Sequence, residues 1–315
     1  MAGGRAPWAA VALLAAGLLL AACGGAARDA SVSGDAPGKR QRGASPESYR
    51  QALVSATKPV SAALAGIPSA KALKALSQRL AQAEQAAGGA ADQLEQVSPP
   101  DDVRAEHADL VQAFRQLNAD LGSLRDAVEG RALCASSAAM ARLGTSDGPV
   151  AVRDASQAMA AKGGAQGYRL DLAFPATPKE QSRRLPNGQF VRPGSRTGRG
   201  ELTIANSSDS DYVVTLALGR RPALSVYVRK GSKDKVTGIR DGTYRIYTTT
   251  GVDWDPKSRA FTRDCTFERF EDSFKFQTTE TATRTEWTTW EITLEPAAGG
   301  NAQTREVDPS DFPVA

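Results

Sequence analysis

The sequence predicts an α+β protein in which an antiparallel helical bundle is followed by an antiparallel β-sandwich. Apolar residues recur at alternating intervals of three and four through residues 45–162, as they do on the buried face of a helix. After about residue 165 the composition changes from Ala, Leu and Gln to Thr, Tyr, Phe and Trp, and short alternating runs end at turn residues, which is typical of strands. The 315 residues are enough for two separate cores.

Five helices are expected in the bundle. Ser45 followed by Pro46 is a typical helix start. Pro59 predicts a kink or a break in the first helix, and Pro99-Pro100 ends the second. The expected helices cover residues 45–67, 73–97, 101–128, 131–143 and 149–162.

The second half of the chain is divided by its composition. Residues 163–200 predict a basic linker, because residues 163–199 hold seven basic and two acidic side chains. Within this linker, residues 168–174 predict a strand, since apolar and polar or small residues alternate there. A β-sandwich of about eight strands is expected over 201–296, and an irregular tail over 297–315. The alternating apolar residues of the linker are Tyr168, Leu170, Leu172 and Phe174.

The first 22 residues predict a signal peptide. Arg5 precedes an uncharged apolar run of fifteen residues, Trp8 to Ala22. This run is too short to cross a bilayer, which takes about 20 residues. Residues 23–44 are rich in Gly, Ala and charged residues without apolar periodicity, and they predict a flexible tether.

The tetrapeptide Leu20-Ala21-Ala22-Cys23 resembles the lipobox of bacterial lipoproteins. The resemblance implies that residues 1–22 are removed and that Cys23 carries a diacylglycerol. The lipid on Cys23 would then anchor the chain at the extracytoplasmic face of the cell membrane. The membrane is therefore one expected partner. The high Ala, Gly and Arg usage is typical of a GC-rich bacterium, such as an actinobacterium.

The run from Asp241 to Arg245, Asp-Gly-Thr-Tyr-Arg, resembles the turn that opens a hairpin in bacterial immunoglobulin-like and transthyretin-like sandwiches. The order of lipobox, helical bundle and β domain is similar to that of uncharacterised actinobacterial envelope lipoproteins. The resemblance implies a fold and a location, and it implies no activity.

Two cysteines remain if Cys23 is lipidated. Cys134 lies in the predicted bundle and Cys265 in the predicted sandwich. In an oxidising compartment the two could form an interdomain disulfide, or each could be a buried free thiol. Their spacing does not indicate a metal site.

The composition argues against several classes of function. The formal net charge is +4, and it falls by one to +3 when Arg5 leaves with the signal peptide, which is too small to predict nucleic-acid binding. His107 is the single histidine, so Ser-His-Asp sets and histidine-based zinc sites are not expected. Because His107 lies on the apolar stripe of the third helix, it predicts a packed residue rather than a pH switch. We therefore expect no catalytic residue, no cofactor and no metal.

Aromatic residues of the β domain are the candidates for ligand binding. Trp287 and Trp290 are three apart in a predicted strand at 284–295, so they should lie on opposite faces, one in the core and one exposed. An exposed ring could stack on a sugar or anchor a protein partner, and cross-strand packing is the alternative. The full candidate set is Tyr247, Trp254, Trp287 and Trp290.

We therefore expect a non-catalytic binding or scaffolding protein of the cell envelope, whose partner is an envelope protein or a cell-wall polymer. One alternative is a module that binds wall polysaccharide through the β-domain aromatics. A second is a carboxylate-based hydrolase that uses Asp253 or Asp255, which flank Trp254. These two acids could also bind calcium, although a charged turn around a packed tryptophan is the simpler interpretation.

Overall fold

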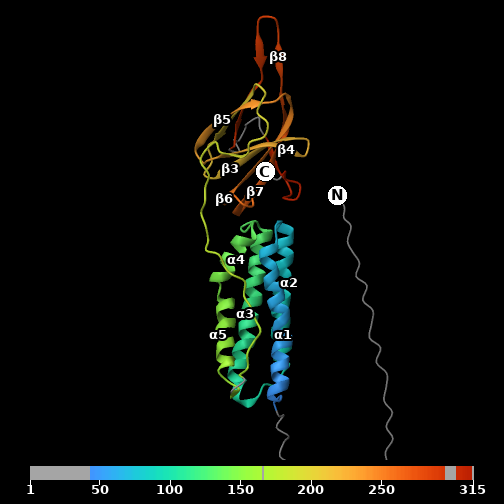
Figure 1. Ribbon diagram of the computed structural model, residues 1–315, viewed down its shortest axis with the longest axis vertical. Helices are drawn as coiled ribbons and strands as arrows, with labels where there is room; N and C mark the ends of the chain where they lie inside the picture. The colour runs from blue at the N-terminus through green and yellow to red at the C-terminus, as the bar shows by residue number, and fades with distance from the viewer. Residues whose placement is uncertain (1–42, 165–166, 295–302, 314–315) are drawn as a thin grey trace, which may run out of the picture. The chain divides into compact units, whose positions relative to one another are not determined.

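The computed structural model describes residues 43–164, 167–294 and 303–313. The predicted signal peptide, Cys23 and almost the whole tether lie outside the described residues. Residues 42–315 form one compact unit. Within it the helices come first and the strands follow (Figure 1), so the α+β class and the order of its two parts are as predicted.

The helical part contains five α-helices among the described residues. Pro59 lies inside the first of them, which continues unbroken, so the predicted break is wrong. The Ser45 hydroxyl accepts a hydrogen bond from the backbone N–H of Ser48 and caps this helix, as predicted. The helices are α1 (Pro46–Gly66), α2 (Leu73–Glu95), α3 (Arg104–Glu129), α4 (Ser136–Thr145) and α5 (Asp147–Ala160), with short 3-10 turns η1 (Ile67–Ser69) and η2 (Asp101–Val103).

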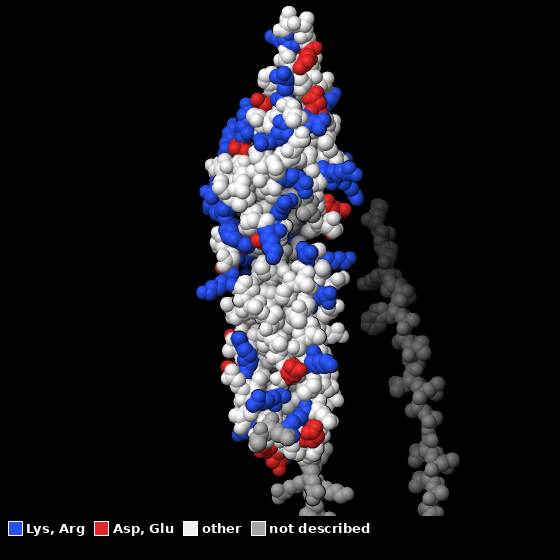
Figure 2. All heavy atoms as spheres, in the orientation of Figure 1, with Lys and Arg blue, Asp and Glu red and all other residues white. Residues whose placement is uncertain are grey.

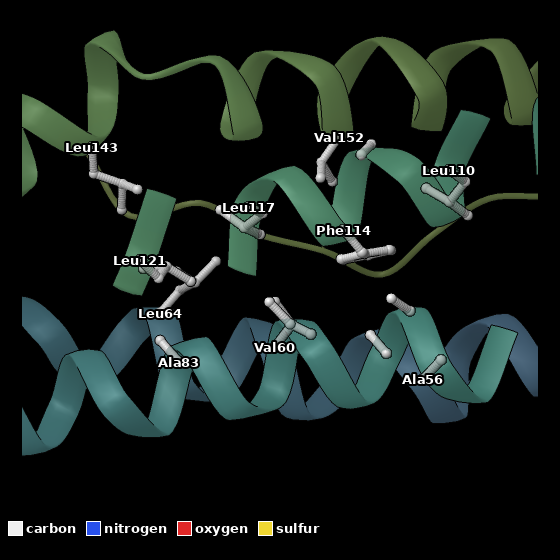
Figure 3. Close-up of a cluster of buried hydrophobic side chains, with 14 of the residues drawn as sticks. Ala56, Val60, Leu64, Ala83, Leu110, Phe114, Leu117, Leu121, Leu143 and Val152 are labelled. Atoms are coloured by element: carbon white, nitrogen blue, oxygen red, sulfur yellow. The ribbon is translucent and has the colours of Figure 1, made fainter. Parts of the chain in front are cut away.

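One apolar core joins these helices (Figure 3). The stripes predicted from the sequence supply it: Val60 of α1, Ala83 of α2 and Phe114 of α3 are all fully buried. The small residues of α2 let its backbone approach its neighbours, and each buried Leu or Phe stabilises the core by about 2 kcal/mol. Close packing also requires glycine at position 148 of α5, because a Cβ there would lie 2.6 Å from the Cα of Leu117.

The predicted strand at 168–174 is wrong, because the structure has no strand there. The alternating apolar residues of this segment are nevertheless turned toward one side, the helical core. Tyr168 is buried in the helical core, and the other three apolar residues of the segment pack against it half-buried. The backbone N–H of Ala173 donates to the Ser61 hydroxyl of α1 at 3.0 Å. The buried face of this segment therefore meets a helix surface instead of a sheet.

The strands form three sheets. The six-stranded sheet has the order β1-β4-β3-β6-β7-β11, a three-stranded sheet has the order β10-β2-β5, and β8 pairs with β9. The pairings are antiparallel except that of β10 with β2, which is parallel and corrects the prediction of a wholly antiparallel part. The strands are β1 (Phe190–Arg192), β2 (Gly200–Asn206), β3 (Asp211–Leu218), β4 (Arg221–Val228), β5 (Ser232–Ile239), β6 (Gly242–Asp255), β7 (Ala260–Phe276), β8 (Thr278–Glu280), β9 (Thr285–Trp287), β10 (Thr289–Thr293) and β11 (Thr304–Glu306).

Both faces of the six-stranded sheet bury apolar side chains. On one face Leu216 and Val226 share a core with Ile204 and Val236 of the three-stranded sheet. On the other face Val213 packs in a second cluster that includes Trp254 and Phe261. The C-terminal segment adds a third cluster, in which Phe312 packs against Tyr247.

Short strands extend the sheet beyond its predicted limits. The predicted linker contributes β1, which pairs with β4, and the predicted irregular tail contributes β11, which pairs with β7. Each of these strands has three residues, which is too short for a visible alternation. In addition, the expected strand at 284–295 is divided into β9 and β10.

Among the described residues, no helix combines the length and the apolar character needed to cross a membrane.

Candidate functional site

A disulfide joins the helical part to β7. Cys134 and Cys265 are bonded, with their Cα atoms 6.4 Å apart and a separation of 131 positions in the chain. The sequence left this bond and two free thiols as alternatives. Backbone hydrogen bonds accompany it: the Cys134 N–H donates to the Thr262 carbonyl at 2.8 Å, and the Cys265 N–H donates to the Arg131 carbonyl at 3.0 Å. Residues on both sides of the junction are thereby held in register.

A hollow of about 410 Å³ lies beside this junction. Its lining includes Glu129, Glu268 and Glu306, together with Arg131. The Arg131 guanidinium forms an ion pair with Glu306 at 2.7 Å and lies over the ring of Phe267. The hollow therefore has acidic walls and one engaged cation, and its described lining residues include no histidine.

The two candidate carboxylates, Asp253 and Asp255, both bind Arg183. The Asp253 carboxylate accepts two guanidinium N–H bonds at 2.8 Å and a third hydrogen bond from the Thr262 hydroxyl. The Asp255 carboxylate accepts the remaining guanidinium bond at 3.0 Å and a bond from the Ser258 hydroxyl. These contacts make Asp253 the partner of a cation rather than a free acid.

The pKa values follow from these contacts. Burial raises the pKa of Asp253, but the hydrogen bonds from Arg183 and Thr262 outweigh it and lower that pKa to about 2. Burial likewise raises the pKa of Asp255, and the hydrogen bonds from Ser258 with the charge of Arg183 bring it below its ordinary value. Both carboxylates are ionised near neutral pH, so neither can act there as the general acid of a hydrolase.

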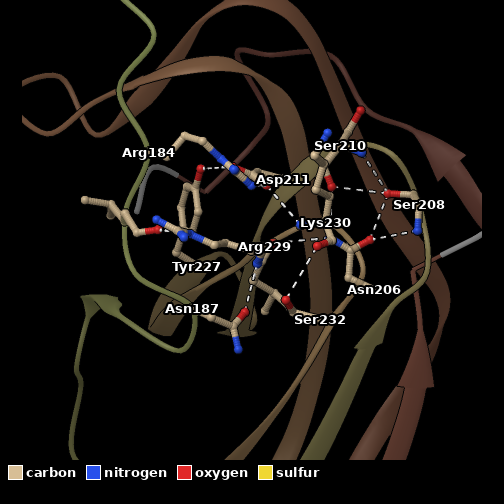
Figure 4. Close-up of polar contacts among 12 residues, drawn as sticks. Arg184, Asn187, Asn206, Ser208, Ser210, Asp211, Tyr227, Arg229, Lys230 and Ser232 are labelled. Carbon is tan, nitrogen blue, oxygen red and sulfur yellow. Dashed lines mark hydrogen bonds and ion pairs between the residues drawn. The ribbon is translucent and has the colours of Figure 1, made fainter.

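A second ion pair joins Arg184 to Asp211 (Figure 4). The Arg184 guanidinium donates two hydrogen bonds of 2.6 Å to the Asp211 carboxylate. Asp211 also accepts from the Tyr227 hydroxyl and from the Lys230 backbone N–H. Burial raises the pKa of Asp211, whereas the bonds from Arg184 and Tyr227 outweigh burial and lower it to about 2.

These two arginines fasten residues 182–189 to the sheet. A hollow of about 200 Å³ lies against them and is lined by both ion pairs. The segment is further held by the Arg229 side chain, which donates to the Leu185 carbonyl at 2.7 Å. Sequence reasoning missed this network, because Arg183 and Arg184 lie in the predicted linker and their partners are 70 and 27 residues away. No local spacing signals such pairs.

His107 is placed where the sequence predicted, in the helical core. Its Nδ1 atom lies 2.8 Å from the Tyr49 hydroxyl, and Tyr168 packs edge-on against Tyr49. Burial lowers the pKa of His107, while a hydrogen bond to the backbone of Leu94 partly offsets that effect. A neutral imidazole that is buried in the helical core and bonded to Tyr49 is a packing residue.

Two of the four candidate aromatics are buried and cannot stack on a ligand. Trp254 is 1% exposed and packs edge-on against Tyr227 and Phe261. Tyr247 is 6% exposed and packs against Phe312. These contacts correct the prediction that Trp254 and Tyr247 bind a ligand. Both residues belong to the core on the face of the six-stranded sheet that also carries Val213.

The other two candidates, Trp287 and Trp290, are exposed by 44% and 37%. The prediction that one of them lies in the core is wrong. Thr288 separates β9 from β10, so the two residues belong to different sheets and the alternation does not continue between them. Trp290 reaches the edge of the core, where its ring packs against Phe274 and its indole N–H donates to the Lys275 carbonyl at 3.0 Å.

No protein-family model matches the chain, and neither the curated proteins nor the solved structures contain a match to it. Within residues 43–164, 167–294 and 303–313, no three His, Cys, Asp or Glu side chains gather in a way that could hold a metal ion.

Acid unfolding tests the two ion pairs. Because the pKa values of Asp211 and Asp253 are lowered to about 2, their ionised forms stabilise the fold fully above pH 4, and this stabilisation is lost as the pH falls through 2. We expect Asp211→Asn to lower the free energy of unfolding at pH 7 by about 2 kcal/mol or more, and to flatten its change between pH 4 and 2. Denaturant titrations from pH 2 to pH 7 measure both effects.

The matched control is Asp92→Asn, because Asp92 is an exposed acid of α2 whose ion pair with Arg115 is 3.8 Å long. This variant should be indistinguishable from the unchanged protein. A pH dependence in Asp211→Asn equal to that of the unchanged chain would show that the Arg184 pair does not stabilise the fold.

Proposed function

We propose that this chain is a bacterial lipoprotein, held by a lipid on Cys23 at the extracytoplasmic face of the cell membrane, and that it is a non-catalytic binding or scaffolding protein. The lipobox-like tetrapeptide supports the anchor. In this proposal the helical part is an antiparallel bundle and the strands form a β-sandwich. The single core shared by the helices and the core shared by the two larger sheets support that description.

Binding is favoured over catalysis because the candidate catalytic groups already have partners. Asp253 and Asp255 are engaged by Arg183, and His107 is buried against Tyr49. A carboxylate hydrolase needs one acid with a raised pKa, whereas both of these acids have lowered values. The observations therefore favour a surface that recognises a partner.

The exposure of Trp287 and Trp290 is the observation that carries the binding proposal. The two rings stand on strands that are otherwise rich in threonine and glutamate. Exposed tryptophans bury a large apolar area when a partner covers them, and their faces stack well on sugar rings. They favour a cell-wall polysaccharide as the ligand, with an envelope protein as the other candidate.

Trp287 gives the cleanest test of this surface, because it lacks the structural contacts of Trp290. A fragment of residues 42–315, which is one compact unit, should pellet with purified bacterial cell wall. We expect Trp287→Ala to weaken this binding by about tenfold or more and to leave the melting temperature unchanged. Trp290→Phe, which keeps a ring on Phe274 but lacks the indole N–H, should weaken it less.

Leu218→Ala is the matched control, because Leu218 is 45% exposed on β3 in another sheet. It should pellet as the unchanged fragment does. Equal pelleting of Trp287→Ala and Leu218→Ala would exclude the tryptophans as the wall contact. Failure of the unchanged fragment to pellet would exclude the cell wall as the ligand and leave a protein partner.

The anchor is tested in the full chain. Cys23→Ser should abolish labelling by a radioactive fatty acid and release the protein from the membrane fraction, because serine has no thiol to accept the diacylglycerol. Cys134→Ser, which removes a different cysteine, should keep both the label and the membrane location. Unchanged membrane retention of Cys23→Ser would contradict the lipoprotein proposal.

A further inference from the structure

Two arginines and a tyrosine lie in one line across the edge of the six-stranded sheet. Tyr247 of β6 is directly opposite Arg269 of β7, and Arg269 is directly opposite Arg305 of β11. Residues paired in this way on neighbouring strands share one face, with their Cα atoms about 5 Å apart. The register therefore places the side chains of Arg269 and Arg305 next to each other on the same face.

A third arginine joins them. Arg245 is two residues before Tyr247 on β6, so its side chain leaves the same face of the sheet. It is exposed, as is Arg305, whereas Arg269 is half-buried. We call Arg245, Arg269 and Arg305 the three-arginine cluster. On the face of the molecule seen in Figure 2, Lys and Arg side chains predominate over much of the strand-rich part.

The three-arginine cluster forms no ion pair in the part of the chain that the structure describes. Arg183, Arg184 and Arg131 each bind a carboxylate. In contrast, no member of the cluster forms an ion pair or a side-chain hydrogen bond to a described residue. Glu271 lies two residues after Arg269 on β7 and therefore on the same face, but it forms no ion pair with a described residue.

This arrangement is unfavourable without an anion. Like charges directly opposite on neighbouring strands are destabilising. The Nε atom of Arg269 is also buried without a hydrogen-bond partner, which is rare in folded proteins.

We propose that the three-arginine cluster binds a phosphate group. One guanidinium fork is enough to satisfy a carboxylate, whereas phosphate has further oxygens that can accept from a second and a third arginine. The ligand is therefore a phosphate-bearing molecule, and its phosphate neutralises the opposed charges of Arg269 and Arg305.

This site is separate from the two tryptophans, which lie on β9 and β10 of the other sheets. The two proposals can therefore fail independently. Trp287→Ala should bind phosphate normally, and the variants of the three-arginine cluster should retain any contact that the tryptophans make.

The test is an isothermal calorimetric titration of the fragment 42–315 with inorganic phosphate at constant ionic strength. We expect saturable binding that Arg269→Gln and Arg305→Gln each weaken about tenfold or more, because each removes charged hydrogen bonds. Arg269→Lys should also weaken binding, since an ammonium keeps the charge and lacks the fork. Arg305 lies on an exposed edge strand, so Arg305→Gln tests the site even if a change at Arg269 disturbs the fold.

Arg192→Gln is the matched control. Arg192 also has a buried Nε atom without a partner, and its opposite residue, Ser225, pairs with Thr215 in the same row. It lies four strands from Arg269, about 19 Å, and has no second arginine opposite it. Its phosphate affinity should stay within about twofold of the unchanged value.

Two results would overturn the proposal. One is a heat of phosphate titration equal to that of sodium chloride, and the other is the same loss of affinity in Arg192→Gln as in Arg269→Gln. A second arm uses vesicles of phosphatidylglycerol. Vesicle binding that Arg269→Gln reduces identifies a lipid headgroup as the source of the phosphate, and binding of inorganic phosphate without vesicle binding identifies a soluble or polymeric source.

Discussion

The structure depends on the junction between residues 131–134 and β7. Three backbone hydrogen bonds and the Cys134–Cys265 disulfide join segments that are about 130 residues apart in the chain. Such a long loop makes the covalent link worth a few kcal/mol, because it restricts the unfolded chain. Thr262 lies at the centre of this contact: its carbonyl accepts from Cys134, and its hydroxyl donates to Asp253. The junction therefore also orients the carboxylate that holds Arg183.

The arginines of the strand-rich part fall into two groups, those bound by a carboxylate and those that are not. Arg183 and Arg184 are bound by buried carboxylates and serve to fix residues 182–189 on the sheet. The three-arginine cluster on β6, β7 and β11 has no such partner among the described residues. An arginine that faces an aspartate thus has a structural role. In our proposal, an arginine that faces another arginine is available to a ligand. The exposed tryptophans are likewise distinguished from Trp254, which is enclosed by its neighbours.

Periodicity predicted the helices well, because one buried stripe on each helix is a local property of the sequence. Periodicity failed where the structure of a segment depends on the element that it packs against or pairs with. Residues 168–174 alternate as a strand does, yet their apolar side meets helices. Trp287 and Trp290 were assigned to opposite faces of one strand, and the break at Thr288 cancels that argument. The pairs Arg183–Asp253 and Arg269–Arg305 could not be predicted, because they depend on register between strands or segments far apart in the chain.

The most direct test of this account is a map of the disulfide in the purified protein. Digestion without reduction, after free thiols have been blocked, should yield one cross-linked peptide pair that contains Cys134 and Cys265, and reduction should separate it. That result would establish the covalent link between the helical part and β7 on which the rest of the structure depends. Recovery of both cysteines as blocked free thiols, or a link of either one to Cys23, would contradict the account.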